Sequence, residues 1–436
     1  MAAIEKRIDP TQEPMYVSPA ERKGIRAAVS VRAGMAFAAP TLMLGATLGM
    51  GLGFSTALLA ALLGYSFVVL YMCFVSAQAA DLGLPTASMA APALGRKGAR
   101  YLVSILVGVI TIGWFGVQTA VCASSLSIML LEVFGIHFPT WAASVILGGL
   151  MLGTAAVGFD GLKVLGAVAA PCLIIVCLYG VFTSISGEGS LSMITDYAPV
   201  ADEMLGFVAG TGMAVGMFAF GGATTADLAR FCRNRRDAVV SSILGVIPTS
   251  MIAIGTGAAL ALVTGESDIA VLMNSIGLPV IGLITLVLAA WSVNAGNVFS
   301  AGVNFNVLLG KSEGGNSRTT TIIAGIAGTL LAMAGILDAF TTFLSMLSAC
   351  GPALAGVLIA DYWIVRKGGR KELGAVSGVS IPGIVAFLAA LLLGMITGGS
   401  FASIAPLAFL DIPFFIGPVN SIVAAIVLYV VLYKVR

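Results

Sequence analysis

Long apolar runs separated by short polar segments dominate the chain from residue 27 to residue 433. A helix needs about 20 mostly apolar residues to cross the hydrocarbon core of a bilayer, and each run approaches or exceeds that length. The pattern therefore predicts an all-α polytopic membrane protein. We expect twelve transmembrane helices, in the ranges 27–53, 54–79, 101–131, 141–158, 162–184, 204–228, 238–264, 277–309, 319–337, 339–364, 380–397 and 414–433.

Composition agrees with this interpretation. Hydrophobic residues make up 59% of the 436 and charged residues only 10%, whereas a soluble domain carries about 25% charged residues. The six cysteines are scattered, and no CxxC or Cys/His spacing indicates a disulfide framework or a zinc site. Residues 1–26 are charged and lack an apolar h-region, so we expect a cytoplasmic tail and no cleavable signal peptide.

The charges alternate in sign from one side of the predicted membrane to the other. If the N-terminus is cytoplasmic, all 22 Lys and Arg residues fall in inner segments, as the positive-inside rule requires. The outer loops hold only acidic charges, at Glu132, Glu188, Asp196, Asp202, Glu203, Glu266, Asp268, Asp338 and Asp411. We therefore expect both termini to be cytoplasmic and the protein to lie in the cytoplasmic membrane. The basic segments are better explained as topology determinants than as nucleic-acid-binding patches.

Two of the predicted spans contain helix-weakening residues. Pro40 lies within the first span, and Gly216, Gly221 and Gly222 lie within the sixth. In many transporters the two halves are inverted repeats, and the interrupted first helix of each half forms the binding site at the bilayer midplane. This placement predicts two interrupted helices. The alternative is that the glycines only allow close helix packing.

Aromatic residues near mid-depth suggest the ligand class. The third span reads "TIGWFGVQTAV", with Trp114 between two glycines and far from the interfaces that belt aromatics occupy. Phe37, Phe218 and Phe220 are further aromatics in the first and sixth spans. Aromatic faces with a few placed amides suit a small, planar, neutral heterocycle. The alternative for Trp114 is a packed core side chain.

The eighth span carries two carboxamides in "LAAWSVNAGNVFSAG". A carboxamide left unpaired in an apolar medium costs roughly 2–7 kcal/mol, so each must have a partner. We expect Asn294 to bind the edge of the ligand, with an interhelical hydrogen bond as the alternative. For Asn297 we expect the structural role.

Several chemistries find no support in the sequence. No ionisable residue is expected deep in a span, which argues against a proton relay, and no GxxxxGK[ST] motif indicates ATP binding. The spans lack paired carboxylates, a Ser/His arrangement or metal ligands, so we do not expect an enzyme. A channel would need a continuous polar stripe, and none is present. Facilitated diffusion remains, or coupling to a cation such as Na+ held by backbone carbonyls and Ser292.

Four ordered motifs resemble a known family: "IGWFGV", "TADLARFCRN", "WSVNAGN" and "GPALAGVLIADYW". They resemble the corresponding segments of cytosine permeases in the nucleobase–cation symporter-1 (purine–cytosine permease) family. The resemblance runs from "ERKGIRAAV" to the tenth span. It implies a leucine-transporter-like fold of five plus five helices in inverted repeat, followed by two C-terminal helices. The units would be residues 27–184, 204–364 and 380–433, after the tail.

The resemblance also implies roles for single residues. Trp114 would stack on a pyrimidine, Phe218 would face the same site, and Asn294 would bind the base. Phe37 would lie at the break of the first helix, close to backbone that binds sodium. The implied cation neighbourhood is Phe37, Ala38, Ala289 and Ser292.

Departures from the family pattern leave the substrate and the coupling ion open. Met217 replaces a serine, Thr111 replaces a glutamine, and Val293 replaces a hydroxyl residue next to Ser292. We expect an importer of a nucleobase or related heterocycle, with cation symport and alternating access. Proton coupling, uncoupled transport, and an amino-acid or amine transporter of the same fold remain alternatives. The expected ligand contacts are Thr111, Trp114, Met217, Phe218, Gly221 and Asn294. No cofactor beyond the ion and no protein partner is expected.

Overall fold

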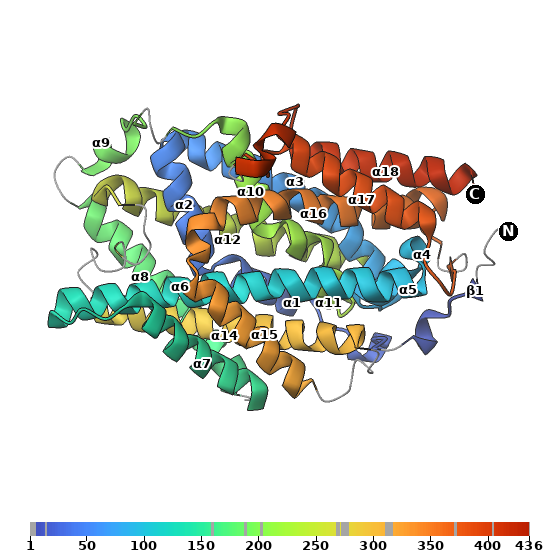
Figure 1. Ribbon diagram of the computed structural model, residues 1–436, viewed down its shortest axis with the longest axis horizontal. Helices are drawn as coiled ribbons and strands as arrows, with labels where there is room; N and C mark the ends of the chain where they lie inside the picture. The colour runs from blue at the N-terminus through green and yellow to red at the C-terminus, as the bar shows by residue number, and fades with distance from the viewer. Residues whose placement is uncertain are drawn as a thin grey trace.

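The chain is mostly helical, and its long helices run roughly parallel to the long axis of the molecule (Figure 1). The computed structural model describes residues 6–13, 15–157, 161–186, 190–200, 204–266, 271, 279–309, 317–369, 373–402 and 405–435. The first elements are β1 (Lys6–Arg7), η1 (Pro10–Gln12), η2 (Pro19–Glu21), α1 (Ile25–Ala36), α2 (Ala39–Leu52), α3 (Phe54–Leu82), α4 (Thr86–Leu94), α5 (Arg96–Gly98), η3 (Ala99–Val103), α6 (Ser104–Phe134), α7 (Thr140–Val157), α8 (Gly161–Ile185) and α9 (Ser190–Thr195).

The second half of the chain repeats this helical character. Its elements are α10 (Phe207–Ala223), α11 (Ala226–Ala229), α12 (Arg235–Thr264), α14 (Pro279–Leu308), α15 (Arg318–Met333), η4 (Ile336–Ala339), α16 (Phe340–Ile359), η5 (Ala360–Val365), β2 (Gly374–Ala375), α17 (Ile381–Thr397), η7 (Ala405–Leu410) and α18 (Gly417–Val435). Several long helices end at a glycine in the left-handed conformation, as at Gly83, Gly135 and Gly265, because glycine adopts positive φ without steric cost.

The helices fall where the apolar runs predict them. Among the described residues, six helices are long and apolar enough to cross a membrane, and α1 and α2 form one bent pair. Five of the remaining predicted ranges hold shorter apolar helices, in α7, α8, α10, α15 and α17. The location of the apolar helices along the chain is thus confirmed.

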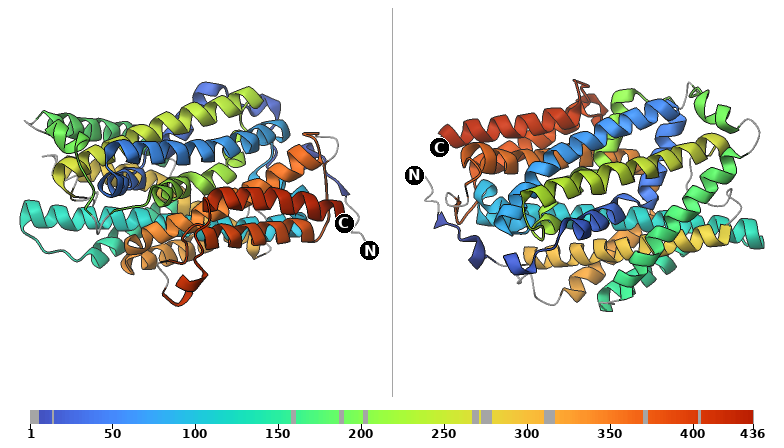
Figure 2. Two further views of the ribbon diagram at one scale, coloured as in Figure 1. Left: turned by 90° about the horizontal axis from the view of Figure 1, so that it is seen from above. Right: turned by 180° about the vertical axis from the view of Figure 1, so that it is seen from behind.

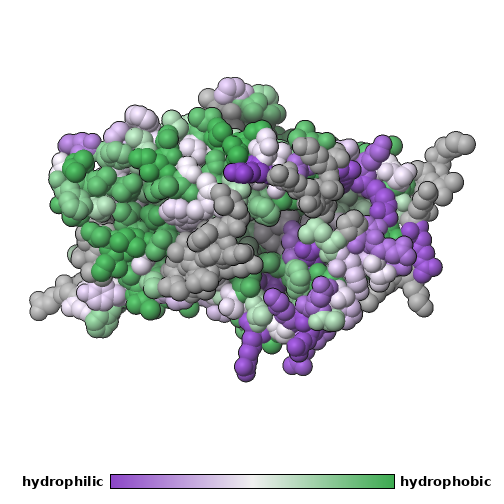
Figure 3. All heavy atoms as spheres, turned by 90° about the horizontal axis from the view of Figure 1, so that it is seen from below, coloured by the Kyte–Doolittle hydropathy of each residue, from purple (hydrophilic) through white to green (hydrophobic). Residues whose placement is uncertain are grey.

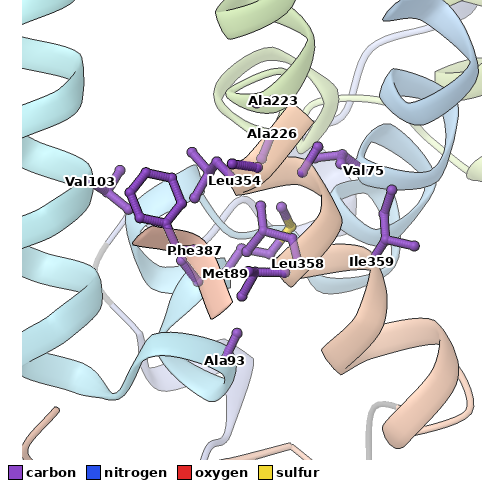
Figure 4. Packing of buried hydrophobic residues seen from close by; sticks show 14 of the residues in the cluster. Val75, Met89, Ala93, Val103, Ala223, Ala226, Leu354, Leu358, Ile359 and Phe387 are labelled. Carbon is purple, nitrogen blue, oxygen red and sulfur yellow. The ribbon is translucent and has the colours of Figure 1, made fainter. Parts of the chain in front are cut away.

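The helices pack in two groups. In one group, α12 packs against α1, α2 and α3, and α10 packs against α3 and α16. In the other, α6 packs against α14, α7 and α15, and α8 packs against α14. The C-terminal helices α17 and α18 pack together and cover α16 (Figures 1 and 2). A large apolar core joins α3, α4, α10, α16 and α17, and Figure 4 shows Phe387, Leu354 and Met89 within it.

The interruption of the first span is confirmed. Helix α1 ends at Ala36, α2 begins at Ala39, and the two axes differ by 56°. Phe37 and Ala38 lie between them in non-helical conformations. Pro40 occupies the first turn of α2, where the missing N–H would have no intrahelical acceptor in any case.

The interruption of the sixth span lies elsewhere than predicted. All three glycines are inside α10, and the helix stops only at Thr224 and Thr225, before the short α11. A Cβ on Gly216 would collide with the Leu344 carbonyl oxygen, and one on Gly222 would lie 2.9 Å from the Tyr71 ring. The prediction of a break at these glycines was therefore wrong, and the close-packing alternative holds for Gly216 and Gly222.

Polar segments gather at one end of the molecule. Strand β1 pairs antiparallel with β2, Arg96 forms an ion pair with Glu13 at 2.7 Å, and Arg235 forms one with Asp81 at 2.6 Å. Figure 1 places β1 and the end of α18 at this same end, and Figure 3 shows hydrophilic residues gathered toward it. The charged residues of the topology prediction that lie outside the described residues are Glu188, Asp202, Glu203, Asp268, Lys311, Arg370, Lys371 and Arg436.

Candidate ligand site and ion neighbourhood

Trp114 of α6 lies beside α16. It is half-buried, and its ring meets the Phe343 ring edge-on, with centroids 5.3 Å apart. A Cβ on Gly113 would lie 2.7 Å from Phe343, and one on Gly116 would lie 3.1 Å from the Gly328 carbonyl oxygen of α15. The glycines around Trp114 therefore make room for neighbouring helices, rather than for a ligand directly.

The sixth-span candidates lie on one half-buried face of α10. Met217, Phe218 and Gly221 are all partly exposed, whereas Phe220 is 6% exposed. Phe218 contacts the Tyr65 ring of α3, with centroids 6.3 Å apart. Trp114, Phe218 and Phe343 all border the same two apolar clusters. Trp114 of α6 and Phe218 of α10 thus border the same apolar clusters, and so does Phe343 of α16, a third aromatic that the sequence did not single out.

Asn294 is fully buried and directed at neighbouring helices. Its Nδ2 donates to the Phe115 carbonyl oxygen at 3.1 Å, to Thr119 Oγ1 at 3.0 Å and to Met151 Sδ at 3.3 Å. The interhelical hydrogen bonds of the alternative interpretation are therefore present. The ligand role of Asn294 stays a prediction, and in this conformation it would have to exchange these partners for the ligand.

Asn297 has a different environment. It is half-buried, and its Nδ2 makes a long contact of 3.5 Å to Asn294 Oδ1. With about 3.6 residues per turn, Asn297 lies about 80° around α14 from Ala289, and Asn294 about 140°. Asn297 is therefore the nearer of the two amides to the face that carries Ala289 and Ser292.

Thr111 is held by its own helix. Its Oγ1 donates to the Val107 carbonyl oxygen at 2.7 Å and to the Gly108 carbonyl oxygen at 3.3 Å. This local bonding is common for a short hydroxyl side chain in a membrane helix. The Thr111 hydroxyl is thus engaged within α6, three residues before Trp114.

The predicted ion neighbourhood is partly assembled. Phe37 is buried in an apolar cluster with Leu286 of α14, and Ala289 packs against the same cluster. The break in the first span and the eighth span thus border the same apolar cluster. The Ala38 carbonyl oxygen accepts the N–H groups of Thr41 and Leu42, at 2.9 and 3.2 Å.

Arg32 is a buried charge near the start of the first predicted span. It sits in α1, is 1% exposed, and donates to the hydroxyls of Ser241, Ser76 and Thr225. The sequence analysis had assigned Arg32 to the inner basic segments because it lies near the start of the first run. The signal that could have revealed it is its position inside that run, together with hydroxyl residues in the second and seventh spans.

Other charged groups are neutralised locally. Asp361 and Arg366 form a buried ion pair at 3.0 Å, and the Tyr429 hydroxyl donates to Asp361 at 2.7 Å. Asp227 is exposed, and its Oδ1 accepts the Thr86 N–H at 2.9 Å. Because Thr86 begins α4, the Asp227 carboxylate pairs an N–H group at the start of that helix.

Comparison with known proteins assigns the family. The model of the family "Permease for cytosine/purines, uracil, thiamine, allantoin" matches residues 16–417. A cytosine permease of Escherichia coli K12 is 32% identical over 390 residues, which cover 89% of each chain. A hydantoin permease of Microbacterium maritypicum is 25% identical over 334 residues, covering 70% of this chain and 65% of the relative.

A solved structure shares the fold. The inward-facing conformation of Mhp1 is 20% identical, covers 99% of this chain and 95% of its own, and has a TM-score of 0.78. The match extends over nearly all the helices described above. With the family model spanning most of the chain, the conclusion is direct: this polytopic membrane protein belongs to the family of permeases for cytosine, purines, uracil, thiamine and allantoin.

Proposed function

We propose that the chain is a secondary transporter that imports a nucleobase or related small planar heterocycle. The observation that carries this proposal is that Trp114 and Phe218, both half-buried, border the same two apolar clusters as Phe343, in a chain of the permease family. Aromatic faces bind a flat ring by stacking, worth about 0.5–1.5 kcal/mol per aromatic pair beyond burial. Relatives named as permeases for cytosine and for hydantoin support the heterocycle class.

The membrane topology belongs to the same proposal. Twelve spans with both termini in the cytoplasm place the polar end that holds β1 and the end of α18 inside the cell (Figure 1). The five-plus-five repeat is supported by the packing of like-placed helices on each other: α3 on α12, α6 on α14 and α7 on α15. Alternating access would then be relative motion of the two helix groups around the ligand.

Within the site, we assign stacking to Trp114 and Phe218 and recognition of the ligand edge to a carboxamide of α14. Asn297 is the better placed amide, because Asn294 is buried against α6 and α7. Met217 on α10 and Thr111 on α6 are half-buried, and neither carries an amide that could bind the ligand edge. The departures at Met217 and Thr111 favour a substituted pyrimidine or another heterocycle over cytosine as the ligand.

The test is a thermal-shift screen of the purified protein, followed by uptake of each hit in vesicles. A ligand that binds only the folded state raises the melting temperature by mass action. We expect hits among nucleobases, hydroxymethylpyrimidine and hydantoins, and Trp114→Ala and Phe218→Ala should each weaken binding about tenfold or more. Hits among amino acids alone would replace the heterocycle proposal with the amino-acid alternative.

The two asparagines are separated by one matched pair of variants. Asn297→Ala should abolish the thermal shift by the heterocycle while leaving the ligand-free melting temperature near that of the wild type. Asn294→Ala should lower the ligand-free melting temperature, because it leaves the buried hydrogen-bond partners of Asn294 unsatisfied. That loss costs about 1–3 kcal/mol of stability. The reverse pattern would restore the ligand role to Asn294.

A further inference from the structure

Arg32 places a permanent positive charge beneath the break in the first span. It lies in α1, five residues before Phe37, and is 1% exposed. The guanidinium donates to Ser241 of α12, to Ser76 of α3 at 3.4 Å, and to Thr225 at 3.3 Å. Because arginine stays protonated in proteins, this charge cannot be removed by neutralisation.

No carboxylate balances this charge within the described part of the chain. The ion pairs found there join Arg96 to Glu13, Arg235 to Asp81 and Arg366 to Asp361. The titratable neighbours of Arg32 are the thiols of Cys73 and Cys232. The charge is instead solvated by a chain of hydroxyl oxygens, which continues from Ser76 to Ser242 at 3.1 Å.

The residues predicted to hold a cation fit sodium poorly. Phe37, Ala38 and Ala289 can offer only backbone carbonyl oxygens, and the Ala38 carbonyl already accepts two N–H groups that begin α2. Ser292 supplies one side-chain oxygen, but Val293 next to it supplies none. A hard cation requires several oxygen ligands, and this set is short of them.

We propose that the fixed charge of Arg32 acts in place of a coupling cation without occupying its site, so that this chain transports its heterocycle without requiring sodium. The five residues from Arg32 to Phe37 span about 7.5 Å of helix, and the extended side chain brings the separation of charges to on the order of 12 Å. At an effective dielectric constant near 20, a fixed charge at that distance weakens binding of a second cation about tenfold. The inference rests on the proposed function.

The contacts of Arg32 also link helices that a bound ion would otherwise link. They tie the inner half of α1 to α3, to α12 and to Thr225, where the sixth span is interrupted. Both interrupted spans are therefore held to the same group of helices by one side chain. Arg32 therefore acts by positioning these helices and through its charge. It does not contact the residues that are predicted to bind the ligand.

The experiment measures heterocycle binding and uptake with sodium chloride or choline chloride, in the full chain. For the wild type, and for Arg32→Lys, which keeps the charge, heterocycle uptake in sodium chloride should differ from uptake in choline chloride by less than about twofold. Arg32→Gln should gain sodium stimulation, with sodium bound about tenfold more tightly. Adding Val293→Thr to Arg32→Gln should increase that stimulation, because it restores a hydroxyl ligand. Arg26→Gln, an exposed arginine on the same helix, is the control and should behave as wild type.

Each outcome decides between supporting and overturning the inference. Wild-type transport that needs sodium overturns it, and so does a folded Arg32→Gln variant that ignores sodium. If Arg32→Gln does not fold, Val293→Thr alone decides: sodium-independent transport supports the role of the charge, and strong sodium stimulation overturns it. Absence of any heterocycle binding by the wild type, in either salt, would instead overturn the proposed function.

Discussion

The two interrupted spans carry similar sequence signals but break in different ways. The first span, with Pro40 among small residues, splits into α1 and α2, whose axes differ by 56°. The sixth span, with three glycines, stays helical through all of them and stops only at Thr224. Proline excludes certain backbone hydrogen bonds wherever it lies, whereas glycine only permits a break or a close contact. The surrounding helices determine whether a given glycine allows a helix break or a close helix contact.

The largest effect on stability is expected from adding a side chain at Gly216, where α10 packs closely against α16. Gly216→Ala places a methyl group against the Leu344 backbone, and because backbone cannot rotate away, the overpacking should cost about 3 kcal/mol or more. The measurement is the melting temperature and the yield of folded protein. Gly212→Ala, on the same helix with nothing within 4 Å of the added atom, should be neutral or slightly stabilising. Equal stability of the two variants would mean that Gly216 is not a packing glycine.

An intermediate effect is expected where the two interrupted spans are linked. Thr225→Val removes one hydroxyl from the buried Arg32 guanidinium and should lower stability by about 1–2 kcal/mol. Its neighbour is the control, since the Thr224 hydroxyl donates only to the Phe220 carbonyl of its own helix, at 2.8 Å. Thr224→Val should therefore change the melting temperature little. If Thr225→Val is as stable as the control, the hydrogen bond between Arg32 and Thr225 does not stabilise the link between α1 and the end of α10.

The smallest effect is expected at the proline itself. Pro40→Ala should cost less than about 1 kcal/mol, chiefly through the unfolded chain, because Pro40 already lies in the first turn of α2. We expect the bend between α1 and α2 to persist, since Phe37 and Leu42 are anchored in a buried cluster. The check is the melting temperature together with the distance between spin labels on α1 and α2. Straightening of the span in Pro40→Ala would show that the proline alone maintains the break.

The candidate site was partly predictable for a similar reason. Trp114 and Phe218 stand out because aromatic residues are unusual at mid-depth, and both border the same two apolar clusters in the fold. The sequence predicts the ligand role for Asn294 and the structural role for Asn297, but it could not show which amide is buried, because that depends on which neighbouring helix each one faces. Phe343 was missed because it lies near the start of the predicted span 339–364, where aromatic residues are common.

The sequence by itself determined which segments are helical and apolar, and the sidedness of charge that predicts their topology. Both follow from the transfer of residues between water and an apolar phase, which depends on composition alone. The tertiary structure decided where the sixth span is interrupted, which asparagine is buried, and that Arg32 lies inside the helix bundle. Those features depend on which helices touch, and contacts between residues such as Arg32 and Ser241, far apart in the chain, are fixed only when the helices have packed.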